Sequence, residues 1–320
     1  MKALVHEEIN KLPVYKNADL PSCEPDESLI QIKAAALNHR DYWIIKGQYA
    51  GLKYPIILGS DGAGLLDNQP VIINPNVNWG DNPNYQSKHY NILGLPKNGT
   101  FAEFVAIKKS HIHPIPDHLN FEQAAALPIA GMTSFRALFV KCNLKKTDKV
   151  LINGVGGGVA LMAFQMANAI GAQVFVTSGD DDKIDKALKM GAVGGVNYTT
   201  EDWSKNMQTL AGGFDVIIDS AAGNGFNHLI KLCNPSARIC IYGGTRGAIN
   251  NISPQPIFWK QISILGSTMS NDTEFVEMLQ FVEKHKIVPV VDSVFKFSES
   301  DEAFKKLEQN SQFGKIVLVP

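Results

Sequence analysis

The chain has 320 residues, with 30 Lys or Arg against 31 Asp or Glu, so its net charge is −1 at pH 7. That length allows about two domains of roughly 150 residues each, and so neutral a balance gives no field to attract nucleic acid or an anionic membrane. Hydrophobic residues make up 45% of the chain and charged residues 19%, which excludes a mostly disordered protein.

Residues 1–120 have the pattern of a β-rich domain. Short apolar runs alternate there with Pro, Gly and Asn, and no long stretch has helical periodicity. The predicted strands cover residues 28–35, 59–66, 69–74 and 101–107. Residues 74–98 are rich in Asn, Pro and Gly and are expected to form a surface lobe. We expect an irregular β-barrel or sandwich.

From residue 121 the pattern changes to alternating strands and helices. The predicted strands cover residues 149–155, 173–178, 195–198, 214–220, 237–243 and 261–266. The predicted helices between and after them cover residues 159–170, 182–190, 203–210, 224–232 and 273–285. Apolar strands separated by helices are typical of a parallel sheet covered on both faces. We therefore predict a doubly wound nucleotide-binding domain over residues 121–287, within an α/β protein.

The last part of the chain returns to the first pattern. Residues 288–320 contain strand-like runs around a predicted helix at 300–308. We expect this tail to complete the domain of residues 1–120, so that the nucleotide-binding domain is inserted between two parts of the first one.

A glycine-rich turn joins the first predicted strand of the second domain to its first helix. The strand VLIN at 150–153 runs into GVGGGVA at 154–160. Glycines at such a turn let the backbone approach a pyrophosphate, which the amides and dipole of the helix N-terminus then bind. The GxGxxG pattern is not strictly met, because Val155 and Ala160 hold its first and third glycine positions. The alternative is a turn made only for close helix packing. The predicted dinucleotide contacts are Gly156, Gly157, Gly158 and Val159.

The end of the next strand bears on which cofactor binds. An NAD enzyme is expected to place Asp or Glu at this strand tip for the ribose 2′-hydroxyl. Here the tip holds Thr177 and Ser178, with Lys183 one turn further on, and a hydroxyl with a cation suits a 2′-phosphate better. The acidic residues 180–182 would repel a phosphate, but we interpret them as the cap and first turn of the following helix. NADPH is therefore favoured over NADH.

A series of short motifs occurs in order along the chain. They are residues 36–41 (ALNHRD), 58–64 (LGSDGAG), 99–104 (GTFAEF), 124–128 (AAALP), 131–133 (GMT), the glycine turn, 214–216 (FDV), 219–220 (DS) and 314–317 (GKIV). By these motifs the chain resembles the zinc-independent quinone oxidoreductase branch of the medium-chain dehydrogenase/reductase superfamily, along nearly its whole length. The resemblance implies a GroES-like β-barrel catalytic domain and a Rossmann domain, with the active site in the cleft between them.

The resemblance also says where zinc would bind. Zinc-dependent relatives have Cys at the position of Asn38 and His-Glu at Ser60-Asp61, and neither Asn nor Ser is a credible catalytic zinc ligand. Those relatives carry four structural Cys ligands in the lobe of residues 74–98, which contains no Cys here. We expect no zinc at either place. A remaining candidate set (His111, His113 and His118) has no acid or Cys to complete it, so we interpret these residues as surface histidines rather than a metal site.

Without a metal, the chain lacks the Lewis acid that would polarise a simple alcohol or ketone. By family position, Asn38 and Asp41 are expected on the floor of the cleft, where Asn38 would orient the carboxamide or the substrate oxygen. Alternatively, Asn38 braces a loop and Asp41 caps the turn into Tyr42. Tyr42 or Tyr49 would supply a proton, with solvent an equal candidate. The candidate catalytic residues are Asn38, Asp41 and Tyr42.

Further cofactor contacts carry over by family position. They are Thr133 at the start of the cofactor-facing helix, Tyr198 after the third strand, Gly243 and Gly244 after the fifth, Gly266, Ser267 and Thr268 after the sixth, and Gly314 and Lys315 in the C-terminal motif. Three alternatives stay open. Thr133 would be only an N-cap, Tyr198 a core aromatic residue, or Lys315 an exposed charge on an edge strand.

These features predict an NADPH-dependent reductase that transfers hydride to an electron-poor small molecule, either a quinone or an α,β-unsaturated carbonyl compound. One alternative is a reductase of enoyl thioesters or other activated alkenes. An alternative of another class is a non-catalytic NADPH-binding protein, as in lens-crystallin members of the family. Pocket walls are expected from loops at 43–54 and 250–259, whose shapes the sequence does not reveal, so the physiological substrate stays open.

The remaining expectations concern partners and location. The family pairs the edge strand of its Rossmann sheet across a two-fold axis, here near residues 262–265, so we expect a homodimer. No apolar run reaches the roughly 18 residues of a membrane span, and acids follow Met1 where a signal peptide would be apolar. Four scattered cysteines without a CxxC pair suit a reducing compartment. We expect a cytoplasmic protein without membrane or nucleic-acid partners.

Overall fold

The computed structural model describes all 320 residues and divides them into two compact units. The first unit comprises Met1–Ile129 and Asn271–Pro320, and the second comprises Ala130–Ser270. The interrupted arrangement of the first unit agrees with the sequence pattern. The first boundary falls later than residue 120, because helix α2 (Phe121–Ala125) packs on strands of the first unit. The second falls earlier than residue 287, because helix α9 (Asp272–His285) belongs to the first unit.

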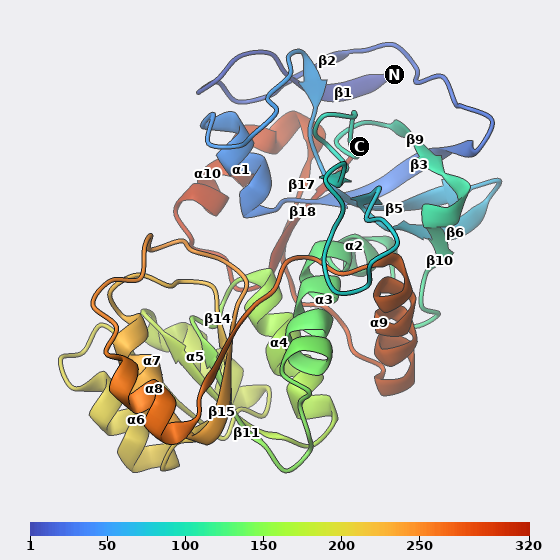
Figure 1. Ribbon diagram of the computed structural model, residues 1–320. Coiled ribbons are helices and arrows are strands. Elements are labelled where there is room, and N and C mark those ends of the chain that lie inside the picture. The colour runs from blue at the N-terminus through green and yellow to red at the C-terminus, as the bar shows by residue number, and fades with distance from the viewer. The chain divides into compact units, whose positions relative to one another are not determined.

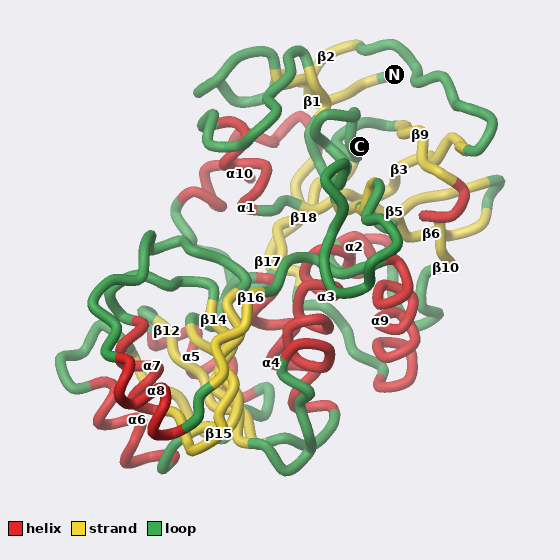
Figure 2. Tube along the Cα trace, in the orientation of Figure 1, coloured by secondary structure: helices red, strands yellow, loops and turns green.

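The first unit is built from strands joined by long loops and short helices (Figure 2). A three-stranded sheet has the order β2 (Val14–Asn17), β1 (Lys2–His6), β4 (Ile56–Ile57). A seven-stranded sheet has the order β10 (Ile112–Pro114), β6 (Gln69–Ile73), β5 (Asp61–Leu66), β3 (Glu27–Ala36), β18 (Lys315–Val319), β17 (Val291–Lys296), with β9 (Phe104–Lys108) also paired to β3. The four strands predicted before residue 120 are therefore confirmed.

The central strand β3 organises the site of this unit. At its end, Ala36 pairs with Asp61 of β5 on one side and with Val317 of β18 on the other. Three distant segments of the chain therefore meet where β3 runs into helix α1 (His39–Ile45). Apolar residues of β1, β3, β9 and α10 (Ser300–Glu308) form the core below them.

The lobe of residues 74–98 is mostly loop, with only the short pair β7 (Asn76–Val77) and β8 (Asn91–Ile92). It is less of a surface feature than its composition suggests, because Trp79, Leu93 and Leu95 are buried. The remaining helices of the unit are η1 (Lys109–His111), α2 (Phe121–Ala125) and η3 (Phe297–Glu299). Helix α3 (Pro128–Phe135) runs across the boundary into the second unit and continues as a π-helical segment, η2 (Arg136–Lys141).

The second unit contains a six-stranded parallel sheet. Its order is β13 (Gly194–Asn197), β12 (Gln173–Ser178), β11 (Lys149–Asn153), β14 (Phe214–Asp219), β15 (Cys233–Ile241), β16 (Ser263–Gly266). In chain order this is 3-2-1-4-5-6, the doubly wound dinucleotide-binding arrangement. All six predicted strands are confirmed, and the strand order reverses between β11 and β14.

Helices cover this sheet on both faces. Helices α6 (Trp203–Ala211), α7 (Phe226–Leu232) and α8 (Pro254–Lys260) gather on one face, while α4 (Gly158–Ala169) packs on the other (Figure 1). Helix α5 (Asp181–Lys189) packs on β12 and β13. The predicted loop at 250–259 was wrong in part, because α8 starts at Pro254, a residue favoured in a first helical turn. None of the chain's helices combines the length and apolar composition needed to cross a membrane.

Candidate active site

The carboxyl edge of the parallel sheet is organised by a side-chain network at the point where strand order reverses. Asn153 ends β11 and Asp219 ends β14, and the Asn153 amide donates to Asp219 at 2.7 Å. Thr177 of β12 donates its hydroxyl proton to Asn153 at 2.7 Å. Open parallel sheets bind their ligands beyond the carboxyl ends of the strands at this reversal. The network thus makes three neighbouring strand ends one rigid platform.

The predicted glycine turn lies on this platform. The Gly154 N–H donates to the Thr177 hydroxyl at 3.0 Å, and the Val155 N–H donates to the Thr177 carbonyl at 2.7 Å. Gly154 and Gly156 have φ of +82° and +139°, where only glycine is comfortable. A Cβ built on Gly157 would meet no atom within 4 Å, so this side of the turn is open.

The turn leads into α4 without a side-chain cap. Gly157 is the N-cap residue and has no side-chain acceptor, so the first amides of α4 are not capped by a side chain. Uncapped amides at a helix N-terminus, beside an open glycine surface, are the groups that bind a pyrophosphate. Residues Gly156 to Val159 therefore fit the phosphates of a dinucleotide.

The acidic residues after β12 form the cap and first turn of helix α5, as predicted. Asp180 caps α5 by accepting from the Asp182 N–H at 3.0 Å, and Asp181 accepts from the Asn197 amide at 3.0 Å. Local structure therefore already engages both carboxylates. Lys183 reaches the glycine turn, since a Cβ on Gly156 would lie 3.5 Å from its Nζ.

A second cation stands at this edge. The guanidinium of Arg246 stacks on the ring of Tyr198, 5.3 Å from its centroid, and that ring packs against Gly179. Arg246 is exposed on the loop after β15 and was not among the predicted site residues. A signal was present, because Arg246 is the only charged residue between Arg238 and Lys260.

The other predicted cofactor residues fall at strand ends, with one exception. Gly244 and Gly266 have open space where a Cβ would stand, whereas a Cβ on Gly243 would meet the Ser220 carbonyl at 2.9 Å. Ser267 and Thr268 follow β16, where the Ser267 N–H donates to Ile241. The exception is Thr133, which was expected at a helix start. It lies buried in the second turn of α3, so it is not an N-cap.

In the first unit, a buried polar cluster gathers Asn38, Asp61 and Lys315. The Lys315 Nζ donates to Asn38 Oδ1 at 2.6 Å and to Asp61 Oδ2 at 2.9 Å. Asn38 Nδ2 donates to the same Asp61 oxygen at 2.9 Å. The side chain of Asp61 is fully buried and that of Lys315 is 6% exposed. The alternative that Lys315 is an exposed edge charge is wrong, because β18 lies between β3 and β17.

The chemistry of the cluster determines how the Asn38 amide is oriented. An ammonium only donates and a carboxylate only accepts, so Oδ1 must face Lys315 and Nδ2 must face Asp61. The second Nδ2 proton points to the Ala36 carbonyl at 3.4 Å. Asn38 has no amide proton left to give a ligand, so only its oxygen can bind one.

Asp41 lies beside this cluster and is fully buried. One carboxylate oxygen accepts from the Asn38 N–H at 2.9 Å, while the other has no hydrogen-bond partner. Burial raises the pKa of Asp41 to about 6, although the neighbouring Arg40 guanidinium and the Asn38 N–H act in the opposite direction. The predicted turn-capping interaction of Asp41 is therefore present at the start of α1.

Arg40 connects the cluster to the lobe of residues 74–98. Its guanidinium donates to Ser60 Oγ at 2.9 Å and to the Leu93 and Ile92 carbonyls at 3.0 and 3.1 Å. Ser60 also donates to Leu93 at 2.8 Å. Ser60 and Arg40 thus hold the lobe in place.

Tyr42 lies apart from these groups. Its hydroxyl donates to Glu308 at 2.5 Å, and Lys46 stands over its ring. The hydrogen bond to the Glu308 carboxylate raises the pKa of Tyr42. The structure thus brings together Asn38 and Asp41 with Lys315 but leaves the Tyr42 hydroxyl on a surface carboxylate.

Zinc does not suit the donors that are present. The positions of Asn38 and Asp61 offer one amide oxygen and one carboxylate, and an ammonium already lies between them. A tetrahedral zinc site needs three or four N, S or carboxylate ligands without a competing cation. The described chain brings together no group of three or more His, Cys, Asp or Glu suited to a metal.

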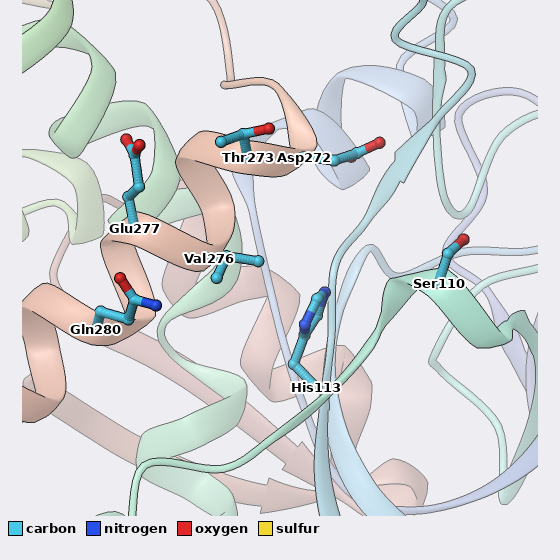
Figure 3. Close-up of a pocket in the computed structure, with 7 residues that line it drawn as sticks. All are labelled: Ser110, His113, Asp272, Thr273, Val276, Glu277 and Gln280. Atoms are coloured by element: carbon cyan, nitrogen blue, oxygen red, sulfur yellow. The ribbon is translucent and has the colours of Figure 1, made fainter.

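The three candidate histidines are half-buried rather than surface residues, and each has its own protein partner. His111 Nε2 stands 3.7 Å from Asp272, His113 packs on Phe275, and His118 bonds the Ile287 carbonyl at 2.9 Å. His113 and Ser110 face one side of α9 across an open pocket (Figure 3). Burial lowers the pKa of both His111 and His113.

Comparison with known proteins agrees with this architecture. The family described as "Alcohol dehydrogenase GroES-like domain" matches residues 24–117, and that described as "Zinc-binding dehydrogenase" matches residues 158–284. The zinc-type alcohol dehydrogenase-like protein YogA of Leptosphaeria maculans is 32% identical, over 93% of this chain and 92% of its own. The chain belongs to the medium-chain dehydrogenase/reductase superfamily. It is an NAD(P)-dependent oxidoreductase of that superfamily.

Other relatives carry different names. The quinone oxidoreductase of Rattus norvegicus is 28% identical, over 96% of this chain and 93% of its own. A crystal structure of an NAD-dependent alcohol dehydrogenase matches with a TM-score of 0.94 and 34% identity over the full length of both chains. The expected GroES-like and Rossmann fold is therefore confirmed, and so is the resemblance at the level of the superfamily.

Proposed function

We propose that the protein is a zinc-independent, NADPH-dependent reductase of the quinone oxidoreductase branch, acting on quinones or α,β-unsaturated carbonyl compounds. The observation that carries the proposal is the Lys315 ammonium between Asn38 and Asp61, at the positions where zinc-dependent relatives have ligands. The Lys315 ammonium at this place disfavours the binding of a zinc ion, because the two positive charges would repel each other. Acceptors that are already electron-poor need no metal to polarise them.

The cofactor preference rests on the carboxyl edge of the parallel sheet. Ser178, Lys183 and Arg246 supply a hydroxyl and two cations around the tip of β12, while Asp180 and Asp181 are engaged in local hydrogen bonds. A hydroxyl and two cations favour the binding of a 2′-phosphate. The names of relatives differ in cofactor. A chloroplastic protein of Arabidopsis thaliana named an NADPH-dependent alkenal/one oxidoreductase is 26% identical, whereas the alcohol dehydrogenase structure compared above is named NAD-dependent.

A bound nicotinamide would supply the hydride, and this chain's residues would bind and orient the reactants. The glycine turn and the amides of α4 bind the phosphates. In the first unit, the cluster of Asn38, Asp61 and Lys315 provides hydrogen-bonding groups for the acceptor oxygen. No side chain of this cluster has the geometry of an obligatory acid, so the proton that completes the product comes from water.

The test uses EDTA-treated protein. NADPH oxidation is followed with four acceptors: 1,4-benzoquinone, 9,10-phenanthrenequinone, a simple enone and crotonyl thioester. NADP⁺ reduction is followed with a primary alcohol. We expect turnover of quinone or enone that survives chelation and exceeds the rate with NADH. Activity confined to the alcohol and lost on chelation would contradict the proposal and favour a zinc-type alcohol dehydrogenase. Preference for the thioester would favour the activated-alkene alternative. Tight NADPH binding without any turnover would favour the non-catalytic one.

We also propose that the chain forms a homodimer through β16. This strand ends the six-stranded sheet, and Ile264 on it is 40% exposed. The neighbouring helix α8 exposes Phe258 and Trp259, by 64% and 81%. An apolar, unpaired edge of this kind needs a cover.

Light scattering is expected to give twice the 35.0 kDa chain mass, and Ile264→Lys is expected to give monomers. Val193→Lys at the opposite edge, where Val193 is 56% exposed, is the matched control and should leave the mass unchanged. A monomeric unmodified protein at micromolar concentration would contradict the assembly.

A further inference from the structure

The Lys315 ammonium has hydrogen-bonding capacity that the protein itself does not use. An ammonium carries three protons, and the structure gives two of them acceptors, Asn38 Oδ1 and Asp61 Oδ2. The third proton has no protein acceptor. The side chain is 6% exposed, and this last proton is the one that the cluster has left for a ligand.

The groups that hold Lys315 are themselves held. Asp61 Oδ1 accepts from the Ile129 N–H at 2.9 Å, and the Asp61 carbonyl accepts from the Thr100 hydroxyl at 2.8 Å. Asn38 is oriented by Asp61 and Ala36. The ammonium is thus aimed before any ligand arrives, and a donor oriented in advance stabilises developing charge without a cost of reorganisation.

Among the neighbouring donors only the Nε–H of Arg40 lacks a partner, and that atom is buried. Both amide protons of Asn38 are engaged. The terminal nitrogens of Arg40 bond Ser60 and the carbonyls of the lobe. The Tyr42 hydroxyl bonds Glu308. Lys315 therefore remains as the charged donor of the cluster.

We propose that Lys315 is the oxyanion-binding catalytic residue, whose third N–H binds the carbonyl oxygen of the acceptor. This rests on the proposed reduction of a quinone or enone. Hydride brings two electrons and forms a C–H bond at the acceptor carbon, and the π pair of the conjugated system moves to the oxygen. Lys315 holds that oxyanion by a hydrogen bond and keeps its own proton. Water then supplies the proton that neutralises the oxygen.

The first test compares acceptors rather than absolute rates. Lys315→Met should lower kcat for an enone by about 10²–10³-fold, the loss typical of one oxyanion donor. The loss for 1,4-benzoquinone should be at least about tenfold smaller, because a better acceptor needs less stabilisation of its oxyanion. The affinity for NADPH should not change. Equal losses for both acceptors, or no loss, would overturn the proposal.

Lys315→Met leaves the Asp61 carboxylate buried without a counter-ion and could fail to fold for that reason. A second variant covers that case. Lys315→Met with Asp61→Asn leaves no buried unpaired charge, and should show the same acceptor-dependent loss. Asp61→Asn alone keeps the Lys315 amine but removes its counter-ion, which favours the neutral form, so it should retain only part of the enone activity and still more than the double variant. Equal activity of the double variant and Asp61→Asn would mean that Lys315 acts only through the ion pair, against the proposal. Lys306→Met, which removes an ion pair with Asp292 in the same unit, is the control and should leave both rates unchanged.

The second readout needs no hydride transfer. 4-Nitrophenol absorbs in the visible range only as its phenolate, an oxyanion of the size of a quinone acceptor. The unmodified protein should bind the phenolate in preference to the phenol, and Lys315→Met should bind it at least about tenfold more weakly. Failure of the unmodified protein to bind phenolate would count against the oxyanion site. Phenolate binding that depends on Lys315, without turnover of any acceptor, would instead leave the site standing and overturn the proposed function.

Discussion

The two parts of the candidate site are built from different materials. At the carboxyl edge of the parallel sheet, one contiguous segment of backbone forms the glycine turn and the uncapped start of α4. In the first unit, the working groups are side chains of Asn38, Asp61 and Lys315, and the last two are 254 residues apart. A backbone site depends on local conformation and open space, whereas a side-chain cluster depends on burial and charge balance. Substitutions in the glycine turn should therefore weaken ligand binding, whereas substitutions in the side-chain cluster should lower stability.

The largest effect is expected on stability in the side-chain cluster. Asp61→Ala leaves the Lys315 ammonium buried without a counter-ion, so the free energy of unfolding should fall by about 3–5 kcal/mol in urea denaturation. Adding Lys315→Met should recover much of that loss, because no charge then stays unpaired. The exposed pair of Asp202 and Lys205, with an N···O distance of 2.7 Å, is the control. Asp202→Ala should have no measurable effect. A small effect of Asp61→Ala would mean that the pair is not buried in solution.

Asp41 should make stability depend on pH in an unusual direction. Its pKa is about 6 in the folded protein against 3.8 as the ordinary value. The folded state thus binds more protons than the unfolded state between these pH values, so the free energy of unfolding falls as pH rises through that window. The full loss above pH 6 is about 3 kcal/mol at most.

Asp41→Asn removes this titration and keeps an oxygen for the Asn38 N–H. Relative to the unmodified protein, the variant should gain stability between pH 4.5 and pH 7.5 in urea titrations. A difference between the two proteins that is independent of pH would show that Asp41 does not titrate in this range.

A substitution in the glycine turn should affect binding and spare stability. Gly157 has φ of −77°, which any residue adopts, and open space where its Cβ would stand. Gly157→Val should therefore fold normally but fill the space that a pyrophosphate needs. We expect the Kd for NADPH to rise about 100-fold, or ~2.7 kcal/mol, measured by fluorescence titration. The Kd of Gly157→Ala should lie between those of the unmodified protein and Gly157→Val. An unchanged Kd in both variants would show that the turn is not part of the cofactor site.

The smallest effect is expected at Arg246. Arg246→Leu removes the guanidinium on Tyr198 but no buried contact. The affinity for NADPH should fall about tenfold, or ~1.4 kcal/mol, while that for NADH stays the same. Lys205→Leu, another exposed cation of the same unit, should change neither. Equal losses for both cofactors would contradict a role in recognising the 2′-phosphate.

The periodicity of the sequence predicted most of the fold. All six parallel strands and the four strands predicted before residue 120 were correctly located, because alternation and apolar runs directly reflect which faces are buried. Strands β1, β2, β4 and β10 of the first unit were not predicted. The glycine turn was also readable, since positive φ and open space are demands on a few neighbouring residues. The start of α3 and the helix α8 were missed, although Pro128 and Pro254 at their first positions are local signals for a helix start.

The sequence by itself determined the backbone part of this protein, namely the doubly wound sheet, its glycine-rich turn and the capping of α5 by Asp180. Only the tertiary structure decided that Lys315 is buried and which groups it contacts. Its position near the C-terminus suggested either a cofactor contact or an exposed edge charge, and no local pattern distinguishes a buried lysine from a solvated one. Its partners are Asn38, the N-cap of α1 just after β3, and Asp61 at the start of β5. The folded sheet brings them together, because β3 pairs with β18 on one side and with β5 on the other. A charge is stable there solely because distant residues neutralise it, and that is a property of topology.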